Sequence, residues 1–194
     1  LISDAFDASL PQKLKPFGEV TTDKNRLGEA HVVLVRSKTK CTKEYIDQAP
    51  NLKLIIRGGV GIDNIDKAYA ESKGIIVRNT PKSSAIAVAE LAFALMLSTP
   101  NNLVAYHNGM KSGQWLKDLK RTELYGKTLC LFGIGNIASK VAERAKAFGM
   151  TVVAYDKYVS SSPLARMVPT AEEAVADADY ISLHLPLTDE TKGM

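Results

Sequence analysis

The sequence predicts an α/β protein that is built from two units with parallel strands. Short apolar runs alternate with segments of helical periodicity along most of the 194 residues, and this alternation is typical of βαβ units. A long helical stretch after Pro81 separates two such series. In each series a glycine cluster follows an apolar run, which is where ligands bind in open α/β sheets. We expect a boundary near Thr80–Lys82, with domains 1–80 and 81–194.

The first series contains predicted strands at 31–37, 52–59 and 75–80. The helix between the first two strands begins after Thr42, a plausible N-cap, and ends before Pro50. The next helix, over 66–74, ends at Gly74 in the C′ position. The opening "LISDAF" and the closing "TKGM" look cut short. We therefore expect both units to be incomplete in this chain.

The stretch 83–111 predicts two helices that connect the units. Ser83 or Ser84 is positioned to cap the first helix, and Pro100 separates it from a second helix that reaches Lys111. Apolar residues recur near helical spacing in the first helix: Ile86, Leu91, Leu95 and Met96. These helices carry more apolar surface than one domain needs, so we expect a homodimer through helices 83–111.

The composition is that of an ordinary soluble protein, with 45% hydrophobic and 24% charged residues. The apolar run Ala85–Leu97 is too short to span a bilayer and contains Glu90, and no signal peptide is evident. Two cysteines suit a reducing cytoplasmic compartment rather than a disulfide framework. A net charge of +4 fits a small anionic ligand. Without a clustered basic stripe we expect no nucleic-acid partner, and we predict no membrane partner and no metal site.

The second series predicts a strand at 128–132, a helix from Asn136, strands over 151–156 and 180–186, and between these a helix inside 170–179. Thr170 and Glu173 have the spacing of a capping box at the start of that last helix. Cys130 lies within an apolar strand and reads as a small core residue.

The sequence "GIGNIA" places Gly133, Gly135 and Ala138 between a buried strand and a helix. Gly133 permits the tight turn, Gly135 allows close approach of a pyrophosphate to the helix N-terminus, and Ala138 is small enough for close helix–strand packing. On the helix, Ile137, Val141, Ala145 and Phe148 share one face. Asp156 ends the next strand at the expected distance of about 20 residues. Its carboxylate suits ribose hydroxyls and repels a 2′-phosphate, which favours NAD over NADP. The alternative is a turn that uses glycine for geometry alone.

The first glycine cluster, "RGGVG", follows the strand over 52–59. Successive N–H groups of Gly58, Gly59 and Gly61 can form an anion nest. Arg57 adds a fork of donors that suits a carboxylate or a phosphate. The alternative is a glycine-rich turn with a solvated arginine.

These pieces together resemble the D-2-hydroxyacid dehydrogenase family, and most of all its D-3-phosphoglycerate dehydrogenase branch. The matching segments run in the family's order over nearly the whole chain: "LISDAF", "VLVRSKTK", "RGGVGIDNID", "GIIVRNTPKSSAIAVAELAFALML", "GQW", "ELYGKTL", "GIGNIA", "FGMTVVAYD" and "ISLHLPLTDETKGM". The resemblance implies an NAD-linked oxidoreductase with a Rossmann-type nucleotide domain and a flavodoxin-like substrate domain. It implies oxidation of D-3-phosphoglycerate to 3-phosphohydroxypyruvate in serine biosynthesis. A glyoxylate or hydroxypyruvate reductase is the alternative within the family, and an NAD-sensing corepressor-like module is the alternative in another class.

The resemblance also implies roles for individual positions. The cofactor-binding residues would be Gly133, Gly135, Asn136 and Ile137 at the pyrophosphate, Asp156 at the ribose, Leu185 and Pro186 at the adenine, and Val60 at the nicotinamide. The substrate-binding residues would be Arg57, Gly58 and Gly59 at the carboxylate, with Arg36 and Lys117 at the phosphate. Some relatives have arginine at the position of Lys117, and lysine gives a point charge instead of a fork. Asn136 stands where the branch often has arginine, which leaves the backbone N–H groups as the pyrophosphate contacts.

The resemblance places the catalytic arginine, carboxylate and histidine or lysine beyond Met194, so we expect no catalytic residue in this chain and no turnover by it alone. His184, at the end of a strand, is expected to have a structural or supporting role. His107, on the second connector helix, is expected to be a packed or exposed surface residue.

Overall fold

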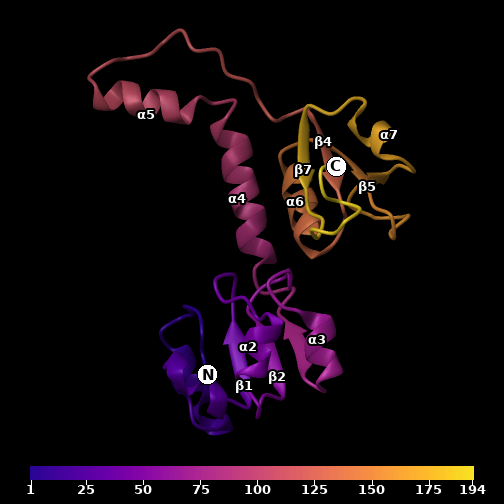
Figure 1. Cartoon of the computed structure of the whole chain (residues 1–194). Helices are drawn as coiled ribbons and strands as arrows, with labels where there is room; N and C mark the ends of the chain where they lie inside the picture. The colour runs from indigo at the N-terminus through magenta and orange to yellow at the C-terminus, as the bar shows by residue number, and fades with distance from the viewer. The chain divides into compact units, whose positions relative to one another are not determined.

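The computed structural model describes residues 1–194, which form two compact units, unit 1 (Leu1–Ser83) and unit 2 (Ser84–Met194) (Figure 1). Each unit holds one sheet whose strands are all parallel. The prediction of an α/β fold with parallel sheets is confirmed.

Unit 1 contains a sheet in the order β1-β2-β3, formed by β1 (Val32–Val35), β2 (Leu54–Arg57) and β3 (Ile76–Asn79). Its helical segments are α1 (Leu10–Leu14), η1 (Lys15–Phe17), η2 (Lys24–Glu29), α2 (Lys43–Asp47) and α3 (Lys67–Ser72). The three predicted strands are confirmed and are shorter than their apolar runs. The short helices between 10 and 29 have no counterpart in the sequence prediction.

The first residues extend this sheet beyond β1. Ser3 N–H donates to Leu34 O at 2.9 Å, and on the other side Ile2 N–H donates to Thr21 O at 2.9 Å. The order of extended segments is therefore 2-1-3-4-5 along the chain, which is the flavodoxin-like order. "LISDAF" contributes only an isolated bridge at Ile2 rather than a full strand.

The helices of unit 1 begin and end where local chemistry dictates. Thr42 accepts a hydrogen bond from Tyr45 N–H at 3.4 Å and caps α2, as predicted. Asp66 caps α3 in the same way, through Tyr69 N–H at 3.0 Å. Gly74, with φ +76°, follows α3 in the left-handed conformation that glycine favours.

The core of unit 1 lies between the sheet and the helices α2 and α3. Val33, Val35 and Ile55 are fully buried there. The alternate residues of the strands face the other side of the sheet, where Leu34 and Ile56 line an open groove of about 610 Å³. That groove contains none of the predicted site residues.

Unit 2 contains a sheet in the order β6-β5-β4-β7, formed by β4 (Thr128–Phe132), β5 (Thr151–Tyr155), β6 (Arg166–Met167) and β7 (Tyr180–Leu183). Its helices are α4 (Ala85–Ser98), α5 (Leu103–Lys111), α6 (Asn136–Ala147) and α7 (Ala171–Val175). In chain order the strands are arranged 3-2-1-4, which is the order of the Rossmann fold. Strand β6, with two residues, has no counterpart in the sequence prediction.

Helix α4 packs on α6 within unit 2. Ala89 is fully buried in this contact, and the rings of Phe93 and Phe148 stack with their centroids 5.4 Å apart. The expected serine cap of α4 is wrong, because Ser84 occupies the N-cap position without a side-chain hydrogen bond. Ser83 Oγ instead donates to Thr80 O at 2.9 Å.

Taken singly, none of the helices has the length and apolar character of a bilayer span. Helices α4 and α5 meet both criteria only together, and the chain bends by 67° between them.

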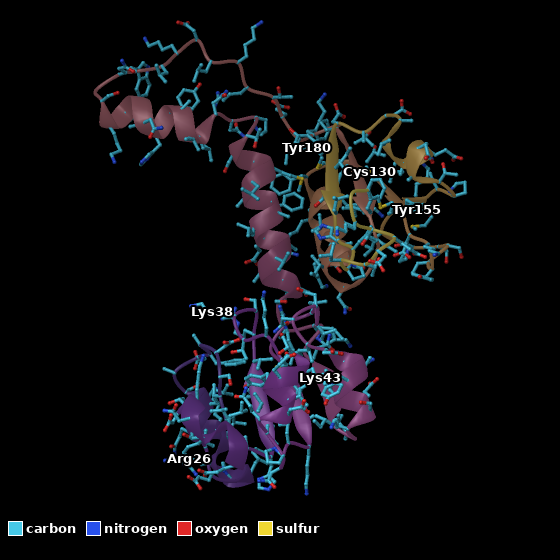
Figure 2. The ribbon with its side chains drawn as sticks, in the orientation of Figure 1. Arg26, Lys38, Lys43, Cys130, Tyr155 and Tyr180 are labelled. Atoms are coloured by element: carbon cyan, nitrogen blue, oxygen red, sulfur yellow. The ribbon has the colours of Figure 1, made fainter.

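The central strand β4 is buried on both faces, because Leu129 and Leu131 pack under α6 while Cys130 and Phe132 pack on the other side. Figure 2 shows Cys130 inside this sheet, which confirms its reading as a core residue. Phe148, the C-cap residue of α6, is 44% exposed, so it does not share the burial of Val141 and Ala145. At α7, Thr170 accepts from Glu173 N–H at 3.2 Å. The reciprocal bond of the predicted capping box is not formed.

Candidate functional site

The turn between β4 and α6 depends on Gly133. Its φ of +85° is a conformation that side chains rarely adopt, and an added Cβ would lie 2.9 Å from the backbone oxygen of His184. Its N–H donates to Tyr155 O at 2.8 Å. Gly133 is therefore required by the fold, whether or not a ligand binds.

Gly135 is glycine for a different reason. It is the N-cap residue of the twelve-residue helix α6, has an ordinary φ of −75° and provides no side-chain cap. An added Cβ would meet nothing within 4 Å. The space before the first turn of α6 is thus open, and Asn136 and Ile137 begin the helix at its edge. An uncapped helix N-terminus beside open space fits an anion such as a pyrophosphate.

Ala138 occupies the third position of the glycine pattern and is fully buried. It packs in the core cluster that joins α6 to β4. The prediction that this position needs only a small residue is confirmed.

Asp156, directly after β5, anchors the glycine turn. Its Oδ2 accepts from Ile134 N–H at 2.9 Å, and its Oδ1 accepts from the N–H groups of Tyr158 at 2.8 Å and Val159 at 3.1 Å. The sequence indicated only the ribose as the partner of this carboxylate. It has acceptor capacity for about four hydrogen bonds, so one remains for a ligand hydroxyl.

Leu185 and Pro186 follow β7 at the same edge of the sheet. The side chain of Leu185 packs against the turn, with Cδ2 3.0 Å from the position of a Cβ on Gly133. Pro186 is exposed, and its carbonyl accepts from Thr191 Oγ1 at 2.6 Å. Unit 2 therefore brings all its predicted cofactor residues to the carboxyl ends of β4, β5 and β7, the position of ligands in this type of sheet.

His184 lies under this edge and is held by the fold. Its N–H donates to Phe132 O at 2.9 Å, and its Nε2 is 2.9 Å from Ser182 Oγ. Burial lowers its pKa, which favours the neutral ring. These contacts give His184 the structural role that the sequence suggested. His107 is exposed on α5.

The second candidate region lies at the carboxyl edge of the sheet in unit 1. The parallel register places Val35, Arg57 and Asn79 level with one another. Arg36 therefore follows β1 beside the glycine cluster, and its Cγ is 3.6 Å from the position of a Cβ on Gly58. The predicted neighbours Arg36, Arg57, Gly58 and Gly59 do meet at this edge.

Side chains hold the loop that carries Arg36. Asp4 accepts from the backbone N–H groups of Arg36 at 2.6 Å and Thr39 at 3.2 Å, and from Thr39 Oγ1 at 2.7 Å. Asn64 Nδ2 donates to Arg36 O and to Thr39 O, both at 2.7 Å. Although partial burial opposes the effect, the hydrogen bonds from Thr39 and Arg36 hold the pKa of Asp4 below its usual range.

The anion nest predicted at Gly58 and Gly59 is different in the structure. Gly58 N–H donates to Val35 O, and Gly59 N–H donates to Thr80 Oγ1, both at 2.8 Å. These donors stabilise the loop and are not free for a carboxylate. The next two N–H groups, of Val60 and Gly61, have no hydrogen-bond partner within the protein.

The guanidinium of Arg57 is folded over Gly59, where an added Cβ would lie far inside contact distance of Nη1. Nη1 donates to Gly58 O at 3.3 Å, and the buried Nε has no partner. A buried donor without a partner costs free energy, so an acceptor atom of a ligand at Nε would stabilise this arginine. It is therefore not the freely solvated side chain of the alternative interpretation.

The remaining predicted residues belong to different units. Arg36 and Val60 lie in unit 1, whereas Lys117 lies in the loop after α5 in unit 2 and is exposed. The pairing of Arg36 with Lys117, and of Val60 with the nicotinamide, stays a prediction.

Comparison with known proteins places this geometry among the dehydrogenases. The model of the D-isomer specific 2-hydroxyacid dehydrogenase NAD binding domain matches residues 93–194. A D-3-phosphoglycerate dehydrogenase of Methanocaldococcus jannaschii is 45% identical over 172 residues, which cover 86% of this chain and 33% of the relative. A hydroxypyruvate reductase of Thermotoga maritima is 46% identical over 165 residues, covering 84% and 54%. The chain thus spans about a third to a half of these two relatives.

Solved structures of related enzymes have a similar fold. The D-lactate dehydrogenase of Aquifex aeolicus, complexed with NAD and lactic acid, has a TM-score of 0.84 and 31% identity, covering 97% of this chain and 61% of that one. An acyclic imino acid reductase in complex with NADPH and D-Arg has a TM-score of 0.88 and 29% identity, covering 98% and 65%.

Proposed function

Because the chain belongs to the D-isomer specific 2-hydroxyacid dehydrogenase family, we propose that its protein is an NAD-dependent oxidoreductase that oxidises D-3-phosphoglycerate to 3-phosphohydroxypyruvate. This is the step that leads into serine biosynthesis. The observation that carries the cofactor part is the open, uncapped N-terminus of α6 beside the turn that Asp156 anchors.

The residues of unit 2 fit NAD in a simple division of roles. The N–H groups of Asn136 and Ile137 would hold the pyrophosphate, since Gly135 leaves the approach open. The free acceptor site of Asp156 would bind a ribose hydroxyl, and Leu185 and Pro186 would line the adenine side. When bound, NAD accepts the hydride of the alcohol carbon.

The substrate part rests on the edge of unit 1. Arg36 would bind the phosphate, because its loop is fixed at both ends by Asp4 and Asn64. Arg57 and the free N–H groups of Val60 and Gly61 would bind the carboxylate, with Gly58 and Gly59 shaping the loop. Lys117 would add a further positive charge at the phosphate.

The competing substrate is hydroxypyruvate, which a similarly close relative from Thermotoga maritima is named for. The two differ by a phosphate, so Arg36→Ala separates them. On the protein expressed from its complete gene, we expect KM for 3-phosphoglycerate to rise by about ten- to a hundredfold. This change corresponds to the free energy of one hydrogen bond to a charged group. Activity with hydroxypyruvate should stay unchanged. An equal effect on both substrates would contradict the phosphate role.

The same proposal includes a homodimer through residues 83–111. Large apolar side chains are exposed on α4 and α5: Ile86, Leu91, Leu95, Leu103, Val104 and Met110. Patches of this kind mark interfaces. Light scattering at micromolar concentration should give twice the monomer mass, and a monomer would contradict it.

The proposal also includes a cytoplasmic location. Two free, buried cysteines are consistent with a reducing cytoplasm.

A further inference from the structure

An ion pair spans the edge of unit 2 at which the ribose is proposed to bind. Lys157 directly follows Asp156, and its Nζ lies 2.8 and 2.9 Å from the two carboxylate oxygens of Glu190. Glu190 belongs to the segment after β7, so the pair joins the segments that follow β5 and β7. The hydrogen bond with Glu190 raises the pKa of Lys157, which keeps the ammonium charged.

The turn that presents Glu190 has its own hydrogen bonds. Thr188 N–H donates to Thr191 Oγ1 at 2.9 Å, and Thr191 Oγ1 donates to Pro186 O at 2.6 Å. Lys192 N–H closes the turn on Thr188 O at 3.0 Å. The Thr191 hydroxyl and the backbone of the turn therefore hold Glu190 opposite Lys157. Asp189, one residue earlier, has no ion-pair partner.

The charges at this corner bear on the choice between NAD and NADP. NADP carries a phosphate on the 2′ oxygen of the ribose that Asp156 would bind, and a nearby cation accommodates that phosphate. Lys157 is such a cation, but Glu190 neutralises it. Asp156, Lys157 and Glu190 together carry one net negative charge, which repels the phosphate.

We propose that Glu190 is a cofactor-specificity residue, which retains Lys157 in an ion pair and thereby strengthens the preference for NAD over NADP. This inference rests on the proposed NAD site. The pair is exposed, with side chains 56% and 66% accessible. Exposed ion pairs have small energies, so releasing Lys157 should change affinity by about two- to fivefold.

The test is isothermal titration of the 194-residue chain with NAD⁺ and with NADP⁺ at low ionic strength. Glu190→Gln should strengthen NADP⁺ binding by about two- to fivefold and leave NAD⁺ binding unchanged. Asp189→Asn is the matched control, because it removes the same charge one residue away without releasing Lys157. The double variant Glu190→Gln with Lys157→Ala should lose the gain.

Three results would overturn the inference. Equal effects of Glu190→Gln and Asp189→Asn would reduce it to a general charge effect, and an unchanged ratio of NADP⁺ to NAD⁺ affinity in Glu190→Gln would refute it directly. In both cases the NAD site itself would stand, because the unaltered chain still binds NAD⁺. An unaltered chain that binds neither nucleotide would instead refute the proposed cofactor site, and the inference with it.

Discussion

The two glycine clusters of this chain look alike in sequence and differ in structure. Both follow a strand at the carboxyl edge of a parallel sheet. In unit 2 the turn leaves the N-terminus of α6 open, with nothing near Gly135. In unit 1 the N–H groups of Gly58 and Gly59 are already bonded within the protein. The comparison teaches that a glycine identifies a place where backbones come close, and only the hydrogen bonds show whether a ligand has donors left.

The largest expected effect is on the glycine that the fold itself requires. Gly133→Ala introduces a Cβ at φ +85° and 2.9 Å from His184 O. We expect unit 2 to lose about 2–3 kcal/mol of unfolding free energy. Hydrogen exchange of the β4 amides measures it for this unit alone. Gly113→Ala, at φ +73° with open space around it, is the control for strain without a clash, and an equal loss there would contradict the role of the contact.

In unit 1 the corresponding substitution removes the side-chain hydrogen bonds of Asn64, here called the Asn64 clamp. Asn64→Ala deletes two hydrogen bonds that hold the loop of Arg36, so we expect a loss of about 1–2 kcal/mol in unit 1. Hydrogen exchange of the β1 and β2 amides reports it. Asn51→Ala removes a single hydrogen bond, to Gly28 O at 3.1 Å, and should cost less. No change on Asn64→Ala would show that the loop does not need the clamp.

Gly135→Ala sharpens the contrast within one turn. Its φ is ordinary and its surroundings are open, so unfolding free energy should change by less than about 0.5 kcal/mol. A methyl group at the approach to α6 should nevertheless lower the affinity for NAD⁺ by about tenfold, or about 1.4 kcal/mol of binding free energy. Calorimetric titration of the variant measures this, and unchanged affinity would mean that the pyrophosphate does not bind here.

The smallest effect concerns pH. Burial lowers the pKa of His184 in the folded state, so the unfolded chain binds its proton first as pH falls. Stability of unit 2 is then complete above pH about 6.5 and declines below it, by at most about 1.4 kcal/mol for each unit of pKa difference. Urea unfolding followed by NMR signals of β4 between pH 7.5 and 5.5 detects it. His184→Gln should remove that dependence, and its persistence would assign the effect to another group.

Much of the fold could be predicted because local signals coincided. The strand at 128–132 and the start of α6 at Asn136 were placed at the right residues, since an apolar run, a glycine turn and a helical face agree there. The two-residue strand β6 has too few residues to form a pattern. The predicted serine cap of α4 was wrong because the Ser83 hydroxyl donates its hydrogen bond to Thr80 O instead.

The site was predictable in its positions and less so in its bonds. Spacing alone located Asp156. The hydrogen bond that its carboxylate accepts from Ile134 N–H depends on how the end of β5 lies relative to the turn. Nothing in "RGGVG" indicates that Val35 and Thr80 take up two of its donors, because both partners are distant in sequence. Asp4 and Asn64 offer no pattern in the sequence either, because Asp4 follows an isolated bridge and Asn64 lies in a turn.

The central claim is that the pyrophosphate of NAD binds at the turn of unit 2 and not at the glycine cluster of unit 1. Titration of the ¹⁵N-labelled chain with NAD⁺, followed by amide chemical shifts, tests it most directly. We predict saturable shifts at Gly135, Asn136 and Ile137 that are larger than any shift at Gly58 or Gly59. Shifts confined to Gly58 and Gly59, or none at the turn of unit 2 at millimolar NAD⁺, would contradict it.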